Sequence, residues 1–119
     1  MYGLSKDEKL DFLLEKELIQ VAIGLNQVIL NFYMDISIDI GGEFNHLRNS
    51  RSLIKNKKLP RSAISLVELL GAHITDIKNS GDGTLELLFS NGDRLQIFDS
   101  EKNYESYTIT LPDGTMVVV

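Results

Sequence analysis

The chain has 119 residues, 43% of them apolar, which fits one domain with a core of its own. Its formal net charge of −5 argues against general nucleic-acid binding, which needs a basic face. The absence of cysteine excludes disulfides, thiolate catalysis and zinc sites built on cysteine. The N-terminal residues are charged, and no apolar run approaches the ~20 residues of a membrane span. We therefore expect a cytoplasmic protein with no membrane partner.

The first predicted element is an amphipathic helix over residues 5–15. Ser5 and Glu8 have the spacing of a capping box. Leucines then recur at helical intervals, with acids on the other side, so one apolar stripe must be buried. We expect this helix to lie across a sheet, and a partner-binding helix is the alternative.

Alternation of apolar and polar residues predicts the strands of the N-terminal half. The expected strands cover residues 19–24, 27–33 and 36–40. The side chains expected to share one face in each are Ile19, Val21 and Ile23, then Val28, Leu30 and Phe32, then Ile36, Ile38 and Ile40. The Gly41-Gly42 pair is predicted to bend the chain on towards Phe44.

Residues 48–61 carry six of the twelve basic residues and no acid. We expect a solvated, poorly ordered loop, because six like charges are not buried unpaired. A docking loop for an anionic partner is the alternative. Pro60 then opens a short helix that Ser62 or Ser65 caps and Gly71 ends. The apolar contacts expected from it are Ile64, Val67, Leu69 and Leu70.

The strongest local signal is a hairpin within residues 81–98. Leu85, Leu87 and Phe89 share one face of a strand, and Asn91-Gly92 fits a two-residue type I′ turn. Leu87, Phe89, Leu95 and Ile97 are expected to be buried together. Further strands are expected at residues 73–78, 107–111 and 116–119, the last two joined by a Pro112-Asp-Gly114 turn.

These elements predict an α+β, mainly β domain over residues 1–119. We expect a curved antiparallel sheet or open barrel of about seven to eight strands, with an N-terminal helix and a short linking helix. Two loosely similar halves, about 5–47 and 62–119, are joined by the basic loop. The likeness fits either a duplication or the common pattern of β-proteins.

No stretch of the sequence carries a recognised catalytic or metal-binding motif, and no cofactor is expected. His46 and His73 lack metal-ligand spacing and are expected to be surface or capping residues. Gly81-Asp-Gly83 is a turn and not a phosphate loop, because no helix begins there. The favoured expectation is that the protein is not an enzyme. An enzyme whose residues come from distant positions is an alternative.

The C-terminal half resembles a small bacterial family of unknown function. The resemblance is carried by Gly81-Asp-Gly-Thr-Leu85, Leu87, Phe89, Asn91-Gly92, Arg94-Leu95, Ile97, Tyr104-Glu-Ser-Tyr107, Pro112-Asp-Gly114 and Val117-Val118. It covers residues 72–118, and the N-terminal half matches only through its strand pattern. The family often has a cysteine after the valines, where this chain has Val119. The resemblance implies no catalytic residues.

In size and acidity the chain also looks like bacterial immunity proteins, which neutralise toxins made by the same or neighbouring cells, as in contact-dependent growth inhibition. The expected partner is a basic toxin domain, with a nuclease as the favoured kind, whose active site the protein would occlude. The residues expected to bind it are Asp82, Glu86, Asp99, Glu101, Tyr104 and Glu105. An ordinary solvated acidic rim is the other interpretation of these residues. A small ligand-binding or housekeeping domain is the alternative function.

Overall fold

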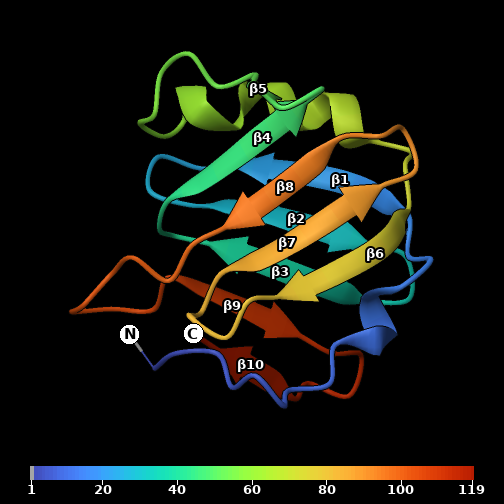
Figure 1. Ribbon diagram of the computed structural model, residues 1–119, viewed down its shortest axis with the longest axis vertical. Helices are drawn as coiled ribbons and strands as arrows, with labels where there is room; N and C mark the ends of the chain where they lie inside the picture. Colours follow the sequence, from blue (N-terminus) through green and yellow to red (C-terminus); the bar gives the residue numbers. More distant parts are fainter. Residues whose placement is uncertain (1) are drawn as a thin grey trace.

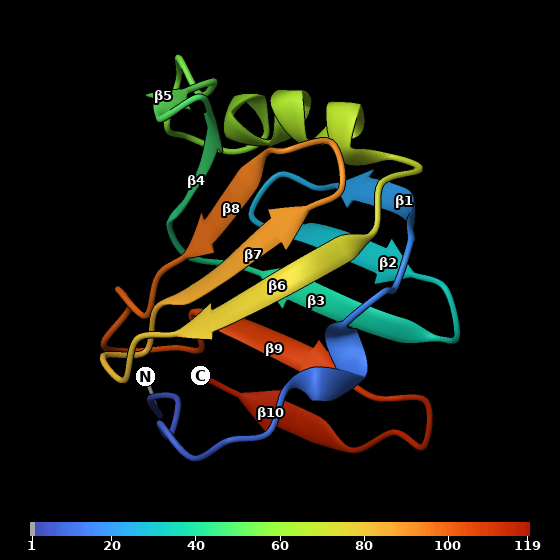
Figure 2. The ribbon, with the colours of Figure 1, turned by 45° about the vertical axis from the view of Figure 1, so that its right-hand side comes forward.

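The computed structural model describes residues 2–119 as two antiparallel five-stranded sheets that pack face to face (Figure 1). The first sheet contains, in order, β1 (Leu18–Ile23), β2 (Val28–Phe32), β3 (Ile36–Ile40), β9 (Tyr107–Thr110) and β10 (Met116–Val118). The second contains β5 (Arg51–Ser52), β4 (Phe44–Arg48), β8 (Arg94–Ile97), β7 (Leu85–Phe89) and β6 (Ile74–Asn79). The mainly β, antiparallel prediction is confirmed. The expected single curved sheet or open barrel of fewer strands is wrong, because the strands divide into two layers (Figure 2).

The chain changes sheets at two places that touch each other. Gly41-Gly42 leads from β3 in the first sheet to β4 in the second, and residues 98–106 lead from β8 back to β9. The amides of both glycines donate to the carbonyl of Ser106, at 3.1 and 2.9 Å. A side chain at Gly42 would lie 3.3 Å from the backbone of Ser106, so the close approach favours glycine. The predicted bend is confirmed, and it is the crossing between the sheets.

The strand order repeats itself with an offset of five strands. In the first sheet, β1, β2 and β3 are neighbours in chain order, and β9 and β10 follow next to β3. In the second sheet, β6, β7 and β8 are neighbours in chain order, and β4 and β5 follow next to β8. The segments before β1 and β6 meet in a bridge between Glu17 and His73. Glu15 and Gly71, which precede these strands, both have positive φ, 66° and 86°. Core positions in one sheet therefore have structural equivalents in the other.

The core lies between the sheets. Phe32 on β2 and Phe89 on β7 stack across it, with ring centroids 6.5 Å apart and an interplanar angle of 18°. The side chains predicted to be inward at Leu87, Phe89, Leu95 and Ile97, and at Val28, Leu30, Phe32, Ile36, Ile38 and Ile40, are all buried. On β1 the predicted face is not a core face, because Ile19 and Ile23 are 54% and 40% exposed.

The predicted N-terminal helix is wrong. Residues 5–15 contain only the short 3-10 helix η1 (Asp11–Leu13), and the Ser5 hydroxyl accepts from the amide of Asp7 instead of forming a capping box. Leu10 and Leu13 are nevertheless buried. The leucine spacing was correct as a sign of burial, but one short turn is enough to place both side chains, and short helices gain little stability by themselves.

The linking helix η2 (Arg61–Leu69) is also a 3-10 helix, and no side chain caps it. Its buried stripe, Ala63, Leu66 and Leu69, has the three-residue period of this helix type. Ile64, Val67 and Leu70, predicted to face the core, are instead 62%, 49% and 43% exposed. Leu69 and the end of the helix at Gly71, with φ +86°, agree with the prediction.

The expected type I′ turn at Asn91-Gly92 is wrong, although the hairpin is confirmed. Gly92 has φ +90° and donates to the carbonyl of Phe89, and the Phe89 amide donates to the carbonyl of Asp93. The loop therefore contains Ser90, Asn91 and Gly92. The Asn91 side chain accepts from the Asp93 amide at 3.0 Å, which holds this longer loop. The Pro112-Asp-Gly114 turn is confirmed, with φ +88° at its glycine.

The basic stretch is more ordered than predicted. Arg48 belongs to β4, and Arg51–Ser52 form β5, which pairs with β4. The Leu53 amide donates to the carbonyl of His46 at 2.8 Å. Residues 55–58 are exposed, as expected for a solvated loop. Among residues 2–119, no helix is long and apolar enough to cross a membrane.

Candidate functional site

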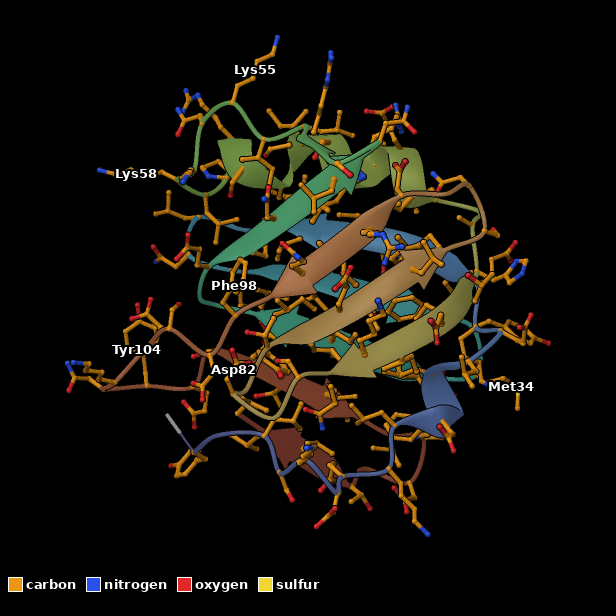
Figure 3. All side chains as sticks on the ribbon, in the orientation of Figure 1. Met34, Lys55, Lys58, Asp82, Phe98 and Tyr104 are labelled. Atoms are coloured by element: carbon orange, nitrogen blue, oxygen red, sulfur yellow. The ribbon has the colours of Figure 1, made fainter. Side chains whose placement is uncertain are left out.

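Five of the six predicted partner-binding residues come from two neighbouring loops at one end of the molecule. Asp82 lies in the loop between β6 and β7, and the other four, Asp99, Glu101, Tyr104 and Glu105, lie in the loop between β8 and β9 (Figure 3). Glu86 is separate, because it lies on β7 and pairs with Arg94 at 2.9 Å.

The two loops are fastened to each other by a buried tyrosine. The Tyr107 hydroxyl on β9 donates to the carbonyl of Gly83 at 2.7 Å. Burial and the nearby carboxylates of Asp99 and Asp82 raise the pKa of Tyr107, so the phenol stays a donor. Gly83 has φ +94°, and a side chain there would lie 2.5 Å from the Cβ of Asp99. This contact fixes the loop that carries Asp82 against the loop that carries Tyr104.

We predict that Tyr107→Phe lowers the free energy of unfolding by about 1–3 kcal/mol, because the Gly83 carbonyl loses its donor in a buried place. Tyr33→Phe is the matched control, since Tyr33 is 60% exposed and its loss should be within about 0.5 kcal/mol. Urea denaturation measures both. Equal losses in the two variants would contradict a structural role for this hydrogen bond.

The acidic side chains of these two loops differ in how far hydrogen bonds within the loops already engage their carboxylates. The Asp82 carboxylate accepts from the Ser80 hydroxyl and from the Thr84 amide, which hold its pKa below the usual range and shape the turn. Asp99 accepts from the Ser106 hydroxyl at 3.1 Å. Tyr104 is 50% exposed, and Glu105 is exposed beside it. Asp82 and Asp99 therefore shape the loops, whereas Tyr104 and Glu105 are available for contact.

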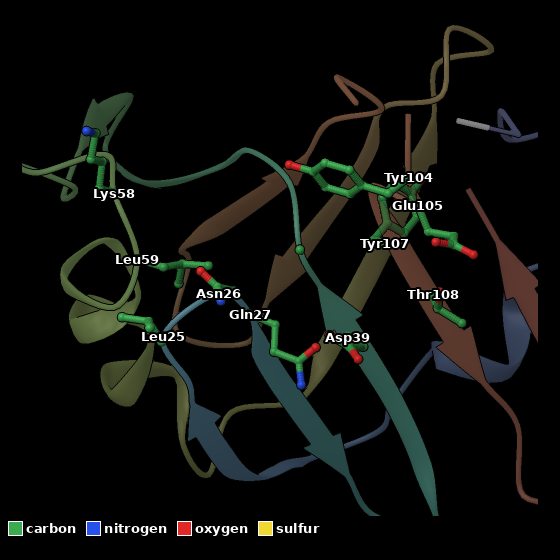
Figure 4. Close-up of a pocket in the computed structure, with 11 residues that line it drawn as sticks. Leu25, Asn26, Gln27, Asp39, Lys58, Leu59, Tyr104, Glu105, Tyr107 and Thr108 are labelled. Carbon is green, nitrogen blue, oxygen red and sulfur yellow. The ribbon is translucent and has the colours of Figure 1, made fainter. Parts of the chain in front are cut away.

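Tyr104 and Glu105 border an open hollow of about 680 Å³ (Figure 4). Asp39, on β3, also lines it, and burial raises the pKa of this carboxyl. Leu25, Leu59 and Lys58 also line the hollow. The lining of the hollow thus combines the carboxylates of Asp39 and Glu105, an aromatic edge, two leucines, further polar side chains and the cation Lys58, and its carboxylates can pair with a cationic side chain.

A second cluster lies at the other end of the second sheet, and the sequence did not predict it. His46 on β4 is fully buried, with Nε2 2.8 Å from Asp93 Oδ2 and Nδ1 2.9 Å from Ser65 Oγ. Arg48 donates to both oxygens of Asp93, at 2.9 and 2.8 Å, and to Glu68 at 3.1 Å. The prediction that His46 is a surface or capping residue is therefore wrong. His73 is at the surface as predicted, 3.4 Å from Glu15.

The cluster fixes the direction of its own hydrogen bonds. Hydrogen bonds from Arg48 and then from His46 hold the pKa of Asp93 below its usual range, so its carboxylate only accepts. His46 must then donate from Nε2. In the neutral imidazole Nδ1 is the acceptor, and the Ser65 hydroxyl donates to it. Asp93, His46 and Ser65 form a relay in that order.

The fold itself does not require this polar relay. Asp93 lies just before β8 and opposite Phe89. Its equivalent in the first sheet is Ile36, which begins β3 and lies opposite Phe32. His46 pairs with Leu95, as Ile109 pairs with Ile38. The equivalent positions of the first sheet thus carry two buried isoleucines. Since the same architecture is built there with apolar side chains, the desolvation cost of the His46–Asp93 pair suggests a task beyond packing.

Comparison with known proteins gives one family. The model of the family described as "Family of unknown function (DUF6188)" matches residues 11–119. This agrees with the resemblance to a small family of unknown function. No curated protein and no solved structure gives a significant match.

Proposed function

The chain belongs to DUF6188, a family of unknown function, and we propose that it is an immunity protein that binds a secreted bacterial toxin. In this proposal the toxin is a basic nuclease domain, and the protein occludes its active site. The observation that carries the proposal is the hollow beside Tyr104 and Glu105, with the half-buried carboxylate of Asp39 in its lining.

The chemistry of this surface suits a basic protein partner. Tyrosine provides contact area at low entropic cost and is common among interface anchors. A lysine or arginine that enters the hollow would pair with Asp39 and offset the burial that raises the pKa of this carboxyl. The net charge of −5 would attract a cationic domain over a longer range and speed association. The hydrogen bond from Tyr107 to Gly83 joins the two loops, and such a constraint reduces the ordering cost of binding.

The test is a Glu101→Lys, Glu105→Lys double variant, titrated against the cognate toxin domain, which this proposal expects to be encoded next to this gene. We expect association to slow at low salt, because two attractive charges become repulsive, and the difference to shrink as salt screens it. The matched control is Glu17→Lys, Asp76→Lys, with the same charge change at exposed positions near the starts of β1 and β6, away from the 98–106 loop (Figure 1).

The outcomes separate the interface from the function. Association that is slowed only by the Glu101→Lys, Glu105→Lys variant supports both this interface and the immunity function. Equal slowing by the two double variants would mean that net charge acts without this surface. If neither double variant changes toxin binding, the interface lies elsewhere on the protein. Absence of any binding to the cognate toxin domain would contradict the immunity proposal.

A further inference from the structure

A second groove, of about 690 Å³, lies between η2 and the segment that follows β5. Its apolar walls are formed by Leu53, Ile54, Ile64 and Val67, and polar or charged side chains also line it, namely Lys55, Asn56, Arg61 and Glu68. Ser65 and Ser62 also line it. The Ser62 hydroxyl is buried and finds no hydrogen-bond partner among the described residues. An unpaired buried hydroxyl is costly, so Ser62 lowers the stability of the fold at this place.

Ser65 connects this groove to the polar relay behind it. Its hydroxyl lies 2.9 Å from Nδ1 of His46, whose Nε2 lies 2.8 Å from Asp93. Ser65 is only partly buried, whereas His46 and Asp93 are fully buried. The least buried member of the relay is thus a serine, whose hydroxyl is hydrogen-bonded to an imidazole that a carboxylate orients. A nucleophile, a base within reach of it and a group that orients the base together form the arrangement of nucleophilic catalysis.

We propose that Ser65 is an activated nucleophile that accepts acyl groups from esters whose apolar acyl chain occupies this groove. The apolar part of the lining indicates the acyl chain, and Ser65 lines the same groove. This goes beyond the proposed binding function. Residues of η2 line the groove, whereas Tyr104 belongs to the loop between β8 and β9. The ribbon shows the helix after β5 and this loop in different parts of the molecule (Figures 1 and 2).

Each step is balanced by the residues present and water. Ser65 Oγ bonds to the ester carbonyl carbon as its proton moves to His46 Nδ1. The bond to the leaving oxygen then breaks, and the leaving alcohol takes that proton. Water attacks the acyl–Ser65 ester, gives a proton to Nδ1, and releases the carboxylic acid as Ser65 Oγ recovers the proton. Asp93 is a positioning residue, because it holds the tautomer of His46, and Arg48 holds Asp93 in turn.

The first test uses a fluorophosphonate probe, which labels nucleophilic serines, on the full chain. We expect one adduct, located at Ser65 by peptide mass spectrometry. Ser65→Ala should abolish it, and His46→Gln should slow labelling by about 100-fold or more, as expected for loss of a histidine base. Ser52→Ala is the matched control, since the Ser52 hydroxyl donates to Asn45 at 2.6 Å and not to an imidazole. The probe should label Ser65 in this variant as fast as in the wild-type chain.

If His46→Gln does not fold, Asp93→Asn tests the same relay, with folding checked by circular dichroism for every variant. A folded wild-type chain that takes no probe would overturn the proposal, and so would labelling that persists in Ser65→Ala.

The second test measures hydrolysis of 4-nitrophenyl acetate and 4-nitrophenyl hexanoate. We expect the hexanoate to react faster, with the reaction lost in Ser65→Ala and unchanged in the Glu17→Lys, Asp76→Lys variant. An acyl adduct on Ser65 without turnover also supports acyl transfer to this serine. Equal rates for wild type and Ser65→Ala with both esters would contradict it. Toxin binding is measured separately, so either proposal can fail alone.

Discussion

Phe89→Ala is expected to lower the free energy of unfolding by about 3–5 kcal/mol. The Phe89 side chain is 1% exposed, and its ring stacks on Phe32 from the opposite sheet, with centroids 6.5 Å apart. Truncation therefore removes apolar contact from both layers and leaves a cavity where the sheets meet. Chemical denaturation of the purified protein measures the loss, provided that the slope of the transition is unchanged.

Two further variants show whether the loss comes from the cavity. Phe89→Leu keeps most of the volume and should cost less than the alanine change. Tyr104→Ala removes an aromatic ring that is 50% exposed, and should change stability by no more than about 0.5 kcal/mol. A loss below about 1 kcal/mol for Phe89→Ala would mean that the two sheets do not meet at this ring.

The sequence predicted the strands better than their arrangement. Alternation identifies which side chains of a strand are inward, and Phe32, Phe89 and Ile97 were placed correctly for that reason. It does not identify the partner strand. The pairings of β3 with β9 and of β4 with β8 join distant parts of the chain, so the division into two sheets could not be predicted from local pattern. The glycine pair 41–42 was the one local sign of the crossing.

The linking helix shows a different limit. Its sequence contains two apolar stripes, one at 63, 66 and 69, and another that includes Ile64 and Val67. The period of an α-helix favours neither stripe clearly. In the 3-10 helix, residues three apart share a face, and the stripe at 63, 66 and 69 is the buried one. Helix type was decided by packing against the sheet, and local residues did not reveal it. The more strongly apolar stripe was therefore the wrong choice.

The buried relay leaves a signal in the sequence at two of its three residues. Asp93 stands two and four residues before Leu95 and Ile97, and His46 stands two after Phe44, so both occupy inward positions. A polar residue in an inward position of an alternating strand indicates a buried polar contact. The third member, Ser65, could not be found this way, because it comes from η2 and meets His46 only in the folded chain.

The largest effect expected at the relay is that of Asp93→Ala, about 3–5 kcal/mol of lost unfolding free energy. This substitution leaves His46 fully buried without a partner for Nε2. Loss of Asp93 costs less at Arg48, because the Arg48 side chain is 41% exposed and water can hydrate its charge. Arg48→Ala leaves the His46–Asp93 pair in place and should therefore cost less than Asp93→Ala. Denaturation midpoints of the two variants give the comparison, and a greater loss for Arg48→Ala would contradict it.

The double variant His46→Ile, Asp93→Ile should regain most of the stability that Asp93→Ala loses. Ile109 and Ile36 occupy the equivalent positions in the first sheet and are buried there, so the architecture accepts this pair. Asp93 is the charged member of this pair, and replacing buried charged groups together with their partners by apolar side chains of similar size is often neutral or stabilising by about 1–4 kcal/mol. Fluorophosphonate labelling of Ser65 should disappear in the same variant. A chain that is stable but unreactive would mean that the pair serves chemistry, at a cost to the fold. A double variant less stable than Asp93→Ala would mean that the pair is needed to hold η2 on the sheet.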